Sequence, residues 1–215
     1  MIRDAPLVCR PAGRHALLVE LPDAERTAAF HAELLRQRAE GALPPVEEIV
    51  PGARTVLLDG VRDPEALARR VAAWDIPAGA ADDGAVVEIA VSYDGPDLPD
   101  VAALWGVGPH EVAALHSALT YRVAFCGFAP GFGYLTGLPQ ELHVPRRDTP
   151  RTRVPAGAVA LAGPYSAVYP RSTPGGWQLI GTMPAPHRLW DSGRDRAALL
   201  TPGTRVRFVA AEGAV

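Results

Sequence analysis

The segment AVALAGPYSAVY at residues 158–169 contains two short β-like runs, 158–162 and 167–169, on either side of the turn signal Gly163-Pro164. Runs of the same kind recur in the second half of the chain, at 121–125, 177–180, 187–190 and 204–209. Short strands separated by glycine and proline turns are typical of a closed or nearly closed β-barrel. We therefore expect residues 83–215 to form a mainly-β barrel domain.

The segment upstream of these runs contains the signals that separate the barrel from the rest of the chain. A strand candidate at 85–91 is followed by two short helix candidates, at about 100–105 and 109–119. We expect both helices to pack on the barrel. Before them, the small and polar stretch 78–84 is typical of a boundary between domains.

Residues 1–82 alternate strand and helix signals. Asp23 is placed to cap a helix whose apolar stripe includes Phe30 and Leu34 and which Gly41 ends. Two strand-like runs at 46–50 and 55–58 then flank a Pro-Gly turn, and Asp63-Pro64 opens a second helix. The order predicts a small α+β domain.

Composition and charge exclude several classes of function. The chain has 215 residues, a net charge of −3 and 21 basic residues, all of them arginine. A protein built to hold nucleic acid is not expected at this charge. Without lysine, the chain has no phosphate-loop lysine, no Schiff-base lysine and no attachment point for biotin. No apolar run approaches the length of a membrane span, and the two cysteines offer no disulfide framework, so we expect a cytoplasmic protein.

Arginine is concentrated in one loop-rich segment of the second half. Between residues 143 and 153 the chain carries Arg146, Arg147, Arg151 and Arg153. Guanidinium groups bind carboxylate or phosphate through paired hydrogen bonds, which points to a small anionic ligand or an acidic partner surface. The alternative for any single arginine is an ordinary ion pair with a nearby acid such as Asp148.

Further candidates lie in the surrounding loops. Gly175 and Gly176 form a tight loop that either presents backbone N–H groups to an anion or is a plain hairpin turn. His116, on the second short helix, is the best candidate for a general acid or base if it faces the arginine loops, and otherwise a packed core histidine. Cys126 falls within a strand-like run, which favours burial over a nucleophilic role. No metal site is expected, since the histidines have no metal-ligand spacing.

The ordered motifs of the second half resemble those of the KipI/PxpB family, which is also labelled allophanate hydrolase subunit 1. The motifs that carry this resemblance are His116-Ser117, Gly127-Phe128-Ala129-Pro130-Gly131-Phe132, Pro145-Arg146-Arg147, Pro150-Arg151, Val154-Pro155-Ala156-Gly157, Ser172-Thr173-Pro174-Gly175-Gly176-Trp177 and Arg205-Val206-Arg207-Phe208. The resemblance implies a small α+β (ferredoxin-like) domain at 1–82 and a cyclophilin-like β-barrel domain at 83–215. One departure concerns a possible substrate contact, because Thr182 stands where the family commonly has arginine.

The resemblance also implies a function. Family members are similar to the PxpB component of an ATP-dependent 5-oxoprolinase, which works with a KipA/PxpC-like subunit and a PxpA-like subunit to convert 5-oxoproline to glutamate. We therefore expect a component that is inactive alone, with ATP bound by or shared with a partner. The candidate catalytic residues are His116 and Arg147, and the candidate substrate-binding residues are Arg146, Arg151, Phe132, Gly175 and Gly176.

Two alternatives stay open at this point. The first is a carboxyltransferase component of the allophanate hydrolase or urea carboxylase type, visited by carboxybiotin carried on another protein. The second is a KipI-type inhibitor of a histidine kinase, which would act through the loop-rich face of the barrel. The shared fold does not choose among these functions.

Overall fold

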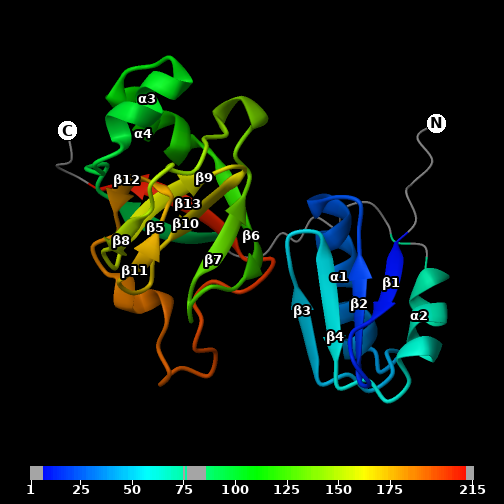
Figure 1. The fold of residues 1–215 in the computed structure, drawn as a ribbon. Coiled ribbons are helices and arrows are strands. Elements are labelled where there is room, and N and C mark those ends of the chain that lie inside the picture. Colours follow the sequence, from blue (N-terminus) through cyan, green and yellow to red (C-terminus); the bar gives the residue numbers. More distant parts are fainter. Residues whose placement is uncertain (1–6, 75, 77–85, 212–215) are drawn as a thin grey trace. The chain divides into compact units, whose positions relative to one another are not determined.

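The computed structural model describes residues 7–74, 76 and 86–211, and its chain separates into two compact units, Met1–Asp83 and Gly84–Val215. Figure 1 shows the elements of both units. The polar stretch 78–84, predicted to be a domain boundary, lies outside the described residues. Each unit has its own hydrophobic core.

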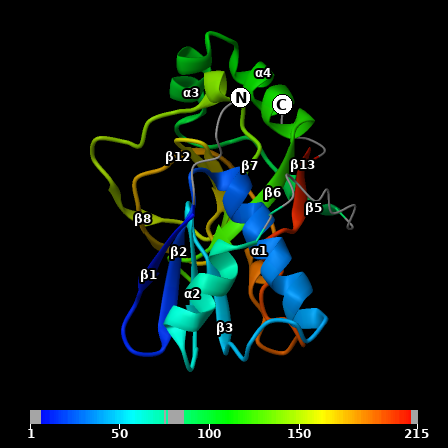
Figure 2. The ribbon, with the colours of Figure 1, turned by 90° about the vertical axis from the view of Figure 1, so that its right-hand side faces the viewer.

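The first unit is a four-stranded antiparallel sheet with two helices. Its elements are β1 (Val8–Pro11), β2 (Ala16–Glu20), α1 (Ala24–Ala39), β3 (Glu48–Pro51), β4 (Thr55–Asp59) and α2 (Pro64–Ala72), and the strand order is β1-β2-β4-β3. Both helices cover the same face of the sheet, as Figure 2 shows. Phe30 and Leu34 of α1 join Leu67 and Val71 of α2 in one buried cluster, so the apolar stripe predicted for the first helix does face a core.

The second unit is built on a seven-stranded sheet that closes almost completely on itself. Its strand order is β12-β9-β10-β7-β6-β13-β5, with bounds β5 (Val86–Val91), β6 (Thr120–Cys126), β7 (Gly133–Thr136), β9 (Ala158–Ala162), β10 (Tyr165–Val168), β12 (Gln178–Thr182) and β13 (Arg205–Ala210). The two edge strands meet where Ser92, just after β5, pairs with Thr182 of β12 through two backbone hydrogen bonds of 2.9 and 2.8 Å. The described residues therefore form a mixed α/β structure with a nearly closed barrel.

Glycine permits the close approach at this seam. A Cβ on Gly95 would lie 2.3 Å from the backbone oxygen of Leu179, and one on Gly181 would lie 2.5 Å from that of Ser92. Real Cβ atoms do not come so close to backbone atoms, so only residues without a side chain fit here. One strand pair is parallel, because β13 runs alongside β5 from Arg205 opposite Val86 to Ala210 opposite Val91.

Two cores lie on the two faces of the barrel wall. The inner cluster draws residues from all seven strands, including Val123, Leu161 and Val206. The outer cluster covers β9, β10 and β12, and it includes Phe132, Tyr169 and Trp177. Because both of its faces are covered, β9 is buried along its whole length.

Smaller elements surround the barrel. Helices α3 (Leu98–Trp105) and α4 (Pro109–Ala118) contact β12 and β13 respectively. A two-stranded ribbon of β8 (Arg151–Val154) and β11 (Thr173–Gly175) contributes Val154 to the outer cluster. The short turns η1 (Gln140–Leu142) and η2 (Pro186–Leu189) are 3₁₀ helices. The strand predicted at 187–190 is therefore wrong, since a proline at 186 begins a helical turn there.

No helix among the described residues has the length and apolar character needed to cross a membrane.

Candidate functional site

The arginines predicted to bind an anion converge on one buried carboxylate. Asp97, which directly precedes α3 and is 2% exposed, accepts a hydrogen bond at Oδ1 from Arg147 Nη1 and another from Arg151 Nη2, both at 2.7 Å. Short hydrogen bonds between charged groups are the strong ones in proteins. Two guanidinium groups from different segments are thereby held side by side.

Backbone hydrogen bonds fix each partner of this cluster. The N–H of Leu179 donates to Asp97 Oδ2 at 2.7 Å, and the N–H of Asp97 donates to the carbonyl of Leu179 at 3.0 Å. The N–H of Arg147 donates to the carbonyl of Gly176 at 2.8 Å, while Arg151 lies opposite Gly175 in the ribbon. Strand β12, the ribbon and the start of α3 thus position the three charged groups together.

Several polar atoms around the cluster have unused hydrogen-bonding capacity. Four are buried without a hydrogen-bond partner in the described part of the chain, namely Arg147 Nε, Arg151 Nη1, Thr173 Oγ1 and Gln178 Oε1. Few buried polar groups in folded proteins lack a partner. These atoms lie on the ribbon, β12 and the segment before the ribbon, where they are available to a bound molecule.

The charge of the cluster suits it to a small anion. Asp97 offsets one of the two guanidinium charges, so the three groups together carry a net charge of +1. The side chains of Arg147 and Arg151 remain 31% and 23% exposed, whereas Asp97 is closed off. An incoming carboxylate or phosphate would therefore meet the guanidinium groups rather than the acid.

Aromatic side chains line the neighbouring outer core. Phe132 is 1% exposed and packs edge-on against the rings of Tyr169 and Trp177. A Cβ on Gly175 would lie 2.4 Å from the hydroxyl of Tyr169, so this glycine is needed for the ring to fit beneath the ribbon. Burial raises the pKa of Tyr169 to about 12, which keeps its hydroxyl protonated at neutral pH. The aromatic cluster and the arginines are therefore adjacent.

Phe128 is the one exposed ring of this group. It is 58% exposed, and its backbone has a φ of 67°, in the left-handed region that larger residues rarely adopt. The ring stands edge-on to Phe132 and Tyr169. Strained backbone of this kind is often found at functional sites.

The other residues predicted to bind substrate differ from Arg147 and Arg151 in their exposure and in their contacts. Arg146 is exposed, and burial raises the pKa values of Tyr134 and Tyr169 while the charge of Arg146 offsets part of that rise. Gly176 contributes its carbonyl to Arg147 and packs against Pro150. Phe132 belongs to the buried core, so its part in the site is to support Phe128 and Tyr169.

His116 occupies a different place from the one that a general acid or base would need. Its side chain is fully buried, with Nδ1 at 2.9 Å from the Tyr93 hydroxyl and Nε2 at 3.0 Å from the Ser166 hydroxyl. Burial lowers the pKa of His116 to about 3, so the ring is neutral at physiological pH. Its ring contacts are Tyr93, Tyr121 and Phe208, none of which belongs to the arginine loops. His116 is therefore a packed, hydrogen-bonded core histidine, which was the alternative considered for it from the sequence.

Asp97 is the member of this charged cluster that the sequence analysis did not identify. In the sequence it stands before a short helix and looks like an ordinary helix cap, with nothing to connect it to arginines fifty and fifty-four positions further on. The sequence shows a surplus of positive charge between residues 116 and 184, but this surplus does not indicate which acid pairs with the arginines.

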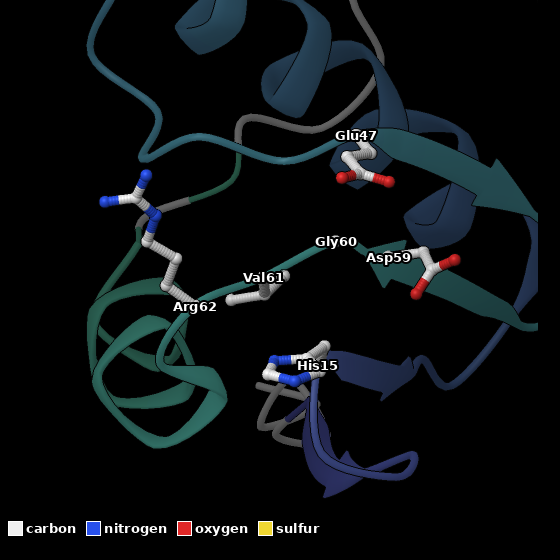
Figure 3. Close-up of a pocket in the computed structure, with 6 residues that line it drawn as sticks. All are labelled: His15, Glu47, Asp59, Gly60, Val61 and Arg62. Carbon is white, nitrogen blue, oxygen red and sulfur yellow. The ribbon is translucent and has the colours of Figure 1, made fainter.

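The first unit contains a hollow. Its volume is about 470 Å³, and it is lined by His15, Glu47, Asp59, Gly60, Val61 and Arg62 (Figure 3). The histidine and both acids are exposed to solvent, and the N–H of Glu47 donates to the carbonyl of Asp59. Among the described residues, no group of three or more His, Cys, Asp or Glu side chains is arranged to hold a metal ion. This hollow offers no comparable concentration of buried charge.

Comparison with known proteins places the chain in a family. Residues 7–200 match the model for the carboxyltransferase domain, subdomains C and D. The chain is 41% identical over 210 residues to the 5-oxoprolinase B subunit of Escherichia coli O157:H7, covering 94% of both proteins. It is 45% identical over 129 residues to the corresponding 5-oxoprolinase B subunit of Haemophilus influenzae, covering 59% of this chain and 60% of that one.

Solved structures share the fold. The protein TTHA0988 is 37% identical with a TM-score of 0.74, and the match covers 96% of this chain but 41% of that longer one. The uncharacterized protein PH0987 from Pyrococcus horikoshii is 30% identical with a TM-score of 0.56, covering 96% and 98% of the two chains. The K. lactis urea amidolyase, 18% identical with a TM-score of 0.68, matches 98% of this chain and 15% of its own length, and this likeness concerns the fold alone.

Proposed function

The chain belongs to the PxpB family of 5-oxoprolinase B subunits, and from this membership we propose that it acts as the PxpB component in the ATP-dependent cleavage of 5-oxoproline to glutamate. The observation that carries the proposal is the 41% identity that extends over 94% of both this chain and its Escherichia coli relative. Because sequence identity extends over nearly all of both proteins, it supports a shared function better than a match confined to one domain would.

The arginine cluster suits the substrate of that reaction. 5-Oxoproline carries one carboxylate beside a lactam, and the cluster of Arg147, Arg151 and Asp97 carries one net positive charge. In this proposal Arg147 and Arg151 bind the substrate carboxylate through charge-assisted hydrogen bonds. Phe128, which is exposed and stands edge-on to the buried ring of Tyr169, would pack against the apolar part of the substrate ring.

ATP enters the reaction as a second substrate. It phosphorylates the lactam oxygen, water adds to the activated carbon, and the C–N bond breaks to give γ-glutamyl phosphate with a free amine. A second water then hydrolyses this acyl phosphate to glutamate and phosphate. The chain has no lysine, so it lacks the phosphate-loop lysine of common nucleotide sites. We therefore place the nucleotide on, or shared with, a KipA/PxpC-like partner, and a PxpA-like protein would complete the complex. The isolated chain is then inactive.

The family resemblance implies a cyclophilin-like fold for the barrel and a ferredoxin-like fold for the first unit, and both fold assignments are part of this proposal.

A carboxyltransferase role is the second candidate function, because the matching family model is that of a carboxyltransferase domain. It would require biotin on another protein, since this chain has no lysine to carry it. Turnover that depends on a biotinylated partner would favour this second function.

The test is co-expression with the KipA/PxpC-like and PxpA-like chains and an assay of ATP-dependent glutamate release from 5-oxoproline. Arg151→Ala should raise KM for 5-oxoproline at least about tenfold, as expected when a charged hydrogen bond is lost. Arg153→Ala is the matched control, because Arg153 lies on the same strand but is exposed and bonded only to Ser172 among its described neighbours. An assembled complex that makes no glutamate would refute the proposal.

A further inference from the structure

Three of the helices in the described part of the chain begin directly after an aspartate, and one of these aspartates forms different hydrogen bonds from the other two. Asp23 accepts a hydrogen bond from the N–H of Arg26 at 2.7 Å, and Asp63 accepts one from the N–H of Ala66 at 2.8 Å. Both are helix caps, as an aspartate at this position normally is. Asp97 makes no such bond to the first turn of α3.

The carboxylate of Asp97 is turned away from its own helix. Both of its oxygens are engaged elsewhere, Oδ1 by Arg147 and Arg151, and Oδ2 by the N–H of Leu179. The first turn of α3 therefore goes without a side-chain cap, although a capping residue is in place. The usual preference of an aspartate at this position for capping its helix is overridden here by the hydrogen bonds to the arginines and to Leu179. This indicates that Asp97 serves the arginine cluster rather than the helix.

The physical effect of Asp97 on the arginines is twofold. Two guanidinium groups repel each other, and a carboxylate oxygen between them offsets that repulsion and holds them together. The same carboxylate reduces the charge of the pair from +2 to +1. Because Asp97 is buried, it does this without occupying the exposed side of the arginines.

We propose that Asp97 is a positioning residue that aligns Arg147 and Arg151 for one substrate carboxylate and sets their charge so that a monocarboxylate is preferred over a dicarboxylate. This inference rests on the proposed function, because it takes the arginine pair to be the substrate's anion site. It assigns to Asp97 no contact with the substrate. Its effect is exerted entirely through the two arginines.

The first experiment does not depend on catalysis. In the full-length chain, NMR signals of the Arg147 and Arg151 guanidinium Nη–H groups, which donate to Asp97, should differ from those of exposed arginines, and Arg147→Lys and Arg151→Lys assign them. Asp97→Asn should move both signals toward the exposed position, because the amide carries no charge to offset the two guanidinium groups and its NH2 group must face either them or the N–H of Leu179. Asp63→Asn, the same substitution at an aspartate that does cap its helix, should leave them unchanged. Signals unaltered by Asp97→Asn would overturn the proposal.

The second experiment measures selectivity in the co-expressed complex. Asp97→Asn should raise KM for 5-oxoproline at least about tenfold, the effect of losing a charge-assisted contact. It should also increase inhibition by glutarate, a dicarboxylate, relative to the monocarboxylate butyrate. A merely structural role would weaken both inhibitors alike, and an unchanged ratio of the two would contradict the assignment.

A second variant covers the case in which Asp97→Asn fails to fold. Asp97→Ser removes the carboxylate while supplying a good capping residue to α3. It should release the arginine signals and change the inhibitor ratio in the same direction. If the wild-type complex does not turn over 5-oxoproline, the proposed function fails, while the arginine signals still decide whether Asp97 positions the pair.

Discussion

Acidification should destabilise the second unit through His116. The buried ring stays neutral in the folded protein, because burial lowers the pKa of His116 to about 3 from an ordinary value of 6.5. The unfolded chain takes up a proton as soon as the pH falls below 6.5, whereas the folded chain does not until the pH approaches 3. Stability is therefore lost as the pH falls from 6.5 toward 3.

The size of the effect follows from the two pKa values. Protonation of the unfolded histidine between pH 7 and pH 5 amounts to about 2 kcal/mol of unfolding free energy, and the full shift corresponds to about 5 kcal/mol. Replacing the ring with a group that does not titrate, as in His116→Gln, should lower stability at pH 7 but remove this part of the pH dependence. The variant leaves Tyr93 and Ser166 with an amide as hydrogen-bond partner.

The assay is urea unfolding at pH 7 and pH 5, followed by tryptophan fluorescence, since three of the four tryptophans lie in the second unit. For each chain we take the change in the free energy of unfolding between pH 7 and pH 5, and we compare this change in the wild-type chain with that in His116→Gln. His31 on α1, whose pKa burial also lowers, provides the control, because His31→Gln should leave the behaviour of the second unit unchanged. Equal pH dependence in the wild-type and His116→Gln chains would refute the reasoning.

Three further predictions concern packing and reactivity. Gly95→Ala should destabilise the second unit by about 3 kcal/mol in thermal or urea unfolding, because its Cβ would overlap the backbone of Leu179, whereas Gly193→Ala, which meets only a side-chain oxygen at 3.3 Å, should have little effect. Phe132→Ala should cost about 3–5 kcal/mol by the same measurement, since the ring is buried against four others, and a loss below about 1 kcal/mol would contradict this packing. Burial raises the pKa of the Cys126 thiol, so iodoacetamide at pH 8 should alkylate it more slowly in the folded chain than in urea, and equal rates would count against its burial.

Much of the secondary structure was predictable because its signals are local. The helix after Asp23, the helix after Asp63 and the strand at 158–162 all begin where caps, turns and apolar runs place them. The strands β7 and β8 were missed, and β11 was interpreted as a loop. These three are short, and glycine, proline or arginine interrupts the alternation that normally reveals a strand. β8 and β11 pair with each other across the two strands that lie between them in the chain, whereas β7 pairs with the preceding strand β6 and with β10.

The candidate site divides in the same way. The concentration of arginine was visible in the sequence, and the structure brings Arg147 and Arg151 together. His116 does not lie with these arginines, because its ring points into the barrel interior and contacts the hydroxyl groups of Tyr93 and Ser166. The sequence did not predict this, since the helical spacing left open which side of α4 the ring would face. Asp97 was beyond sequence reasoning, since its role follows from long-range contacts that override a local capping preference.

The parallel pairing of β5 with β13 has a consequence for how the protein is made. The first strand of the second unit waits for a neighbour that emerges from the ribosome about 120 residues later, and such long-range pairing is slow to form. Until then β5 and β6 both present open edges, because β13 lies between them in the sheet. A chain that is cut short before Arg205 therefore loses the strand that joins these two edges, and it is expected to aggregate rather than to persist as a shortened domain.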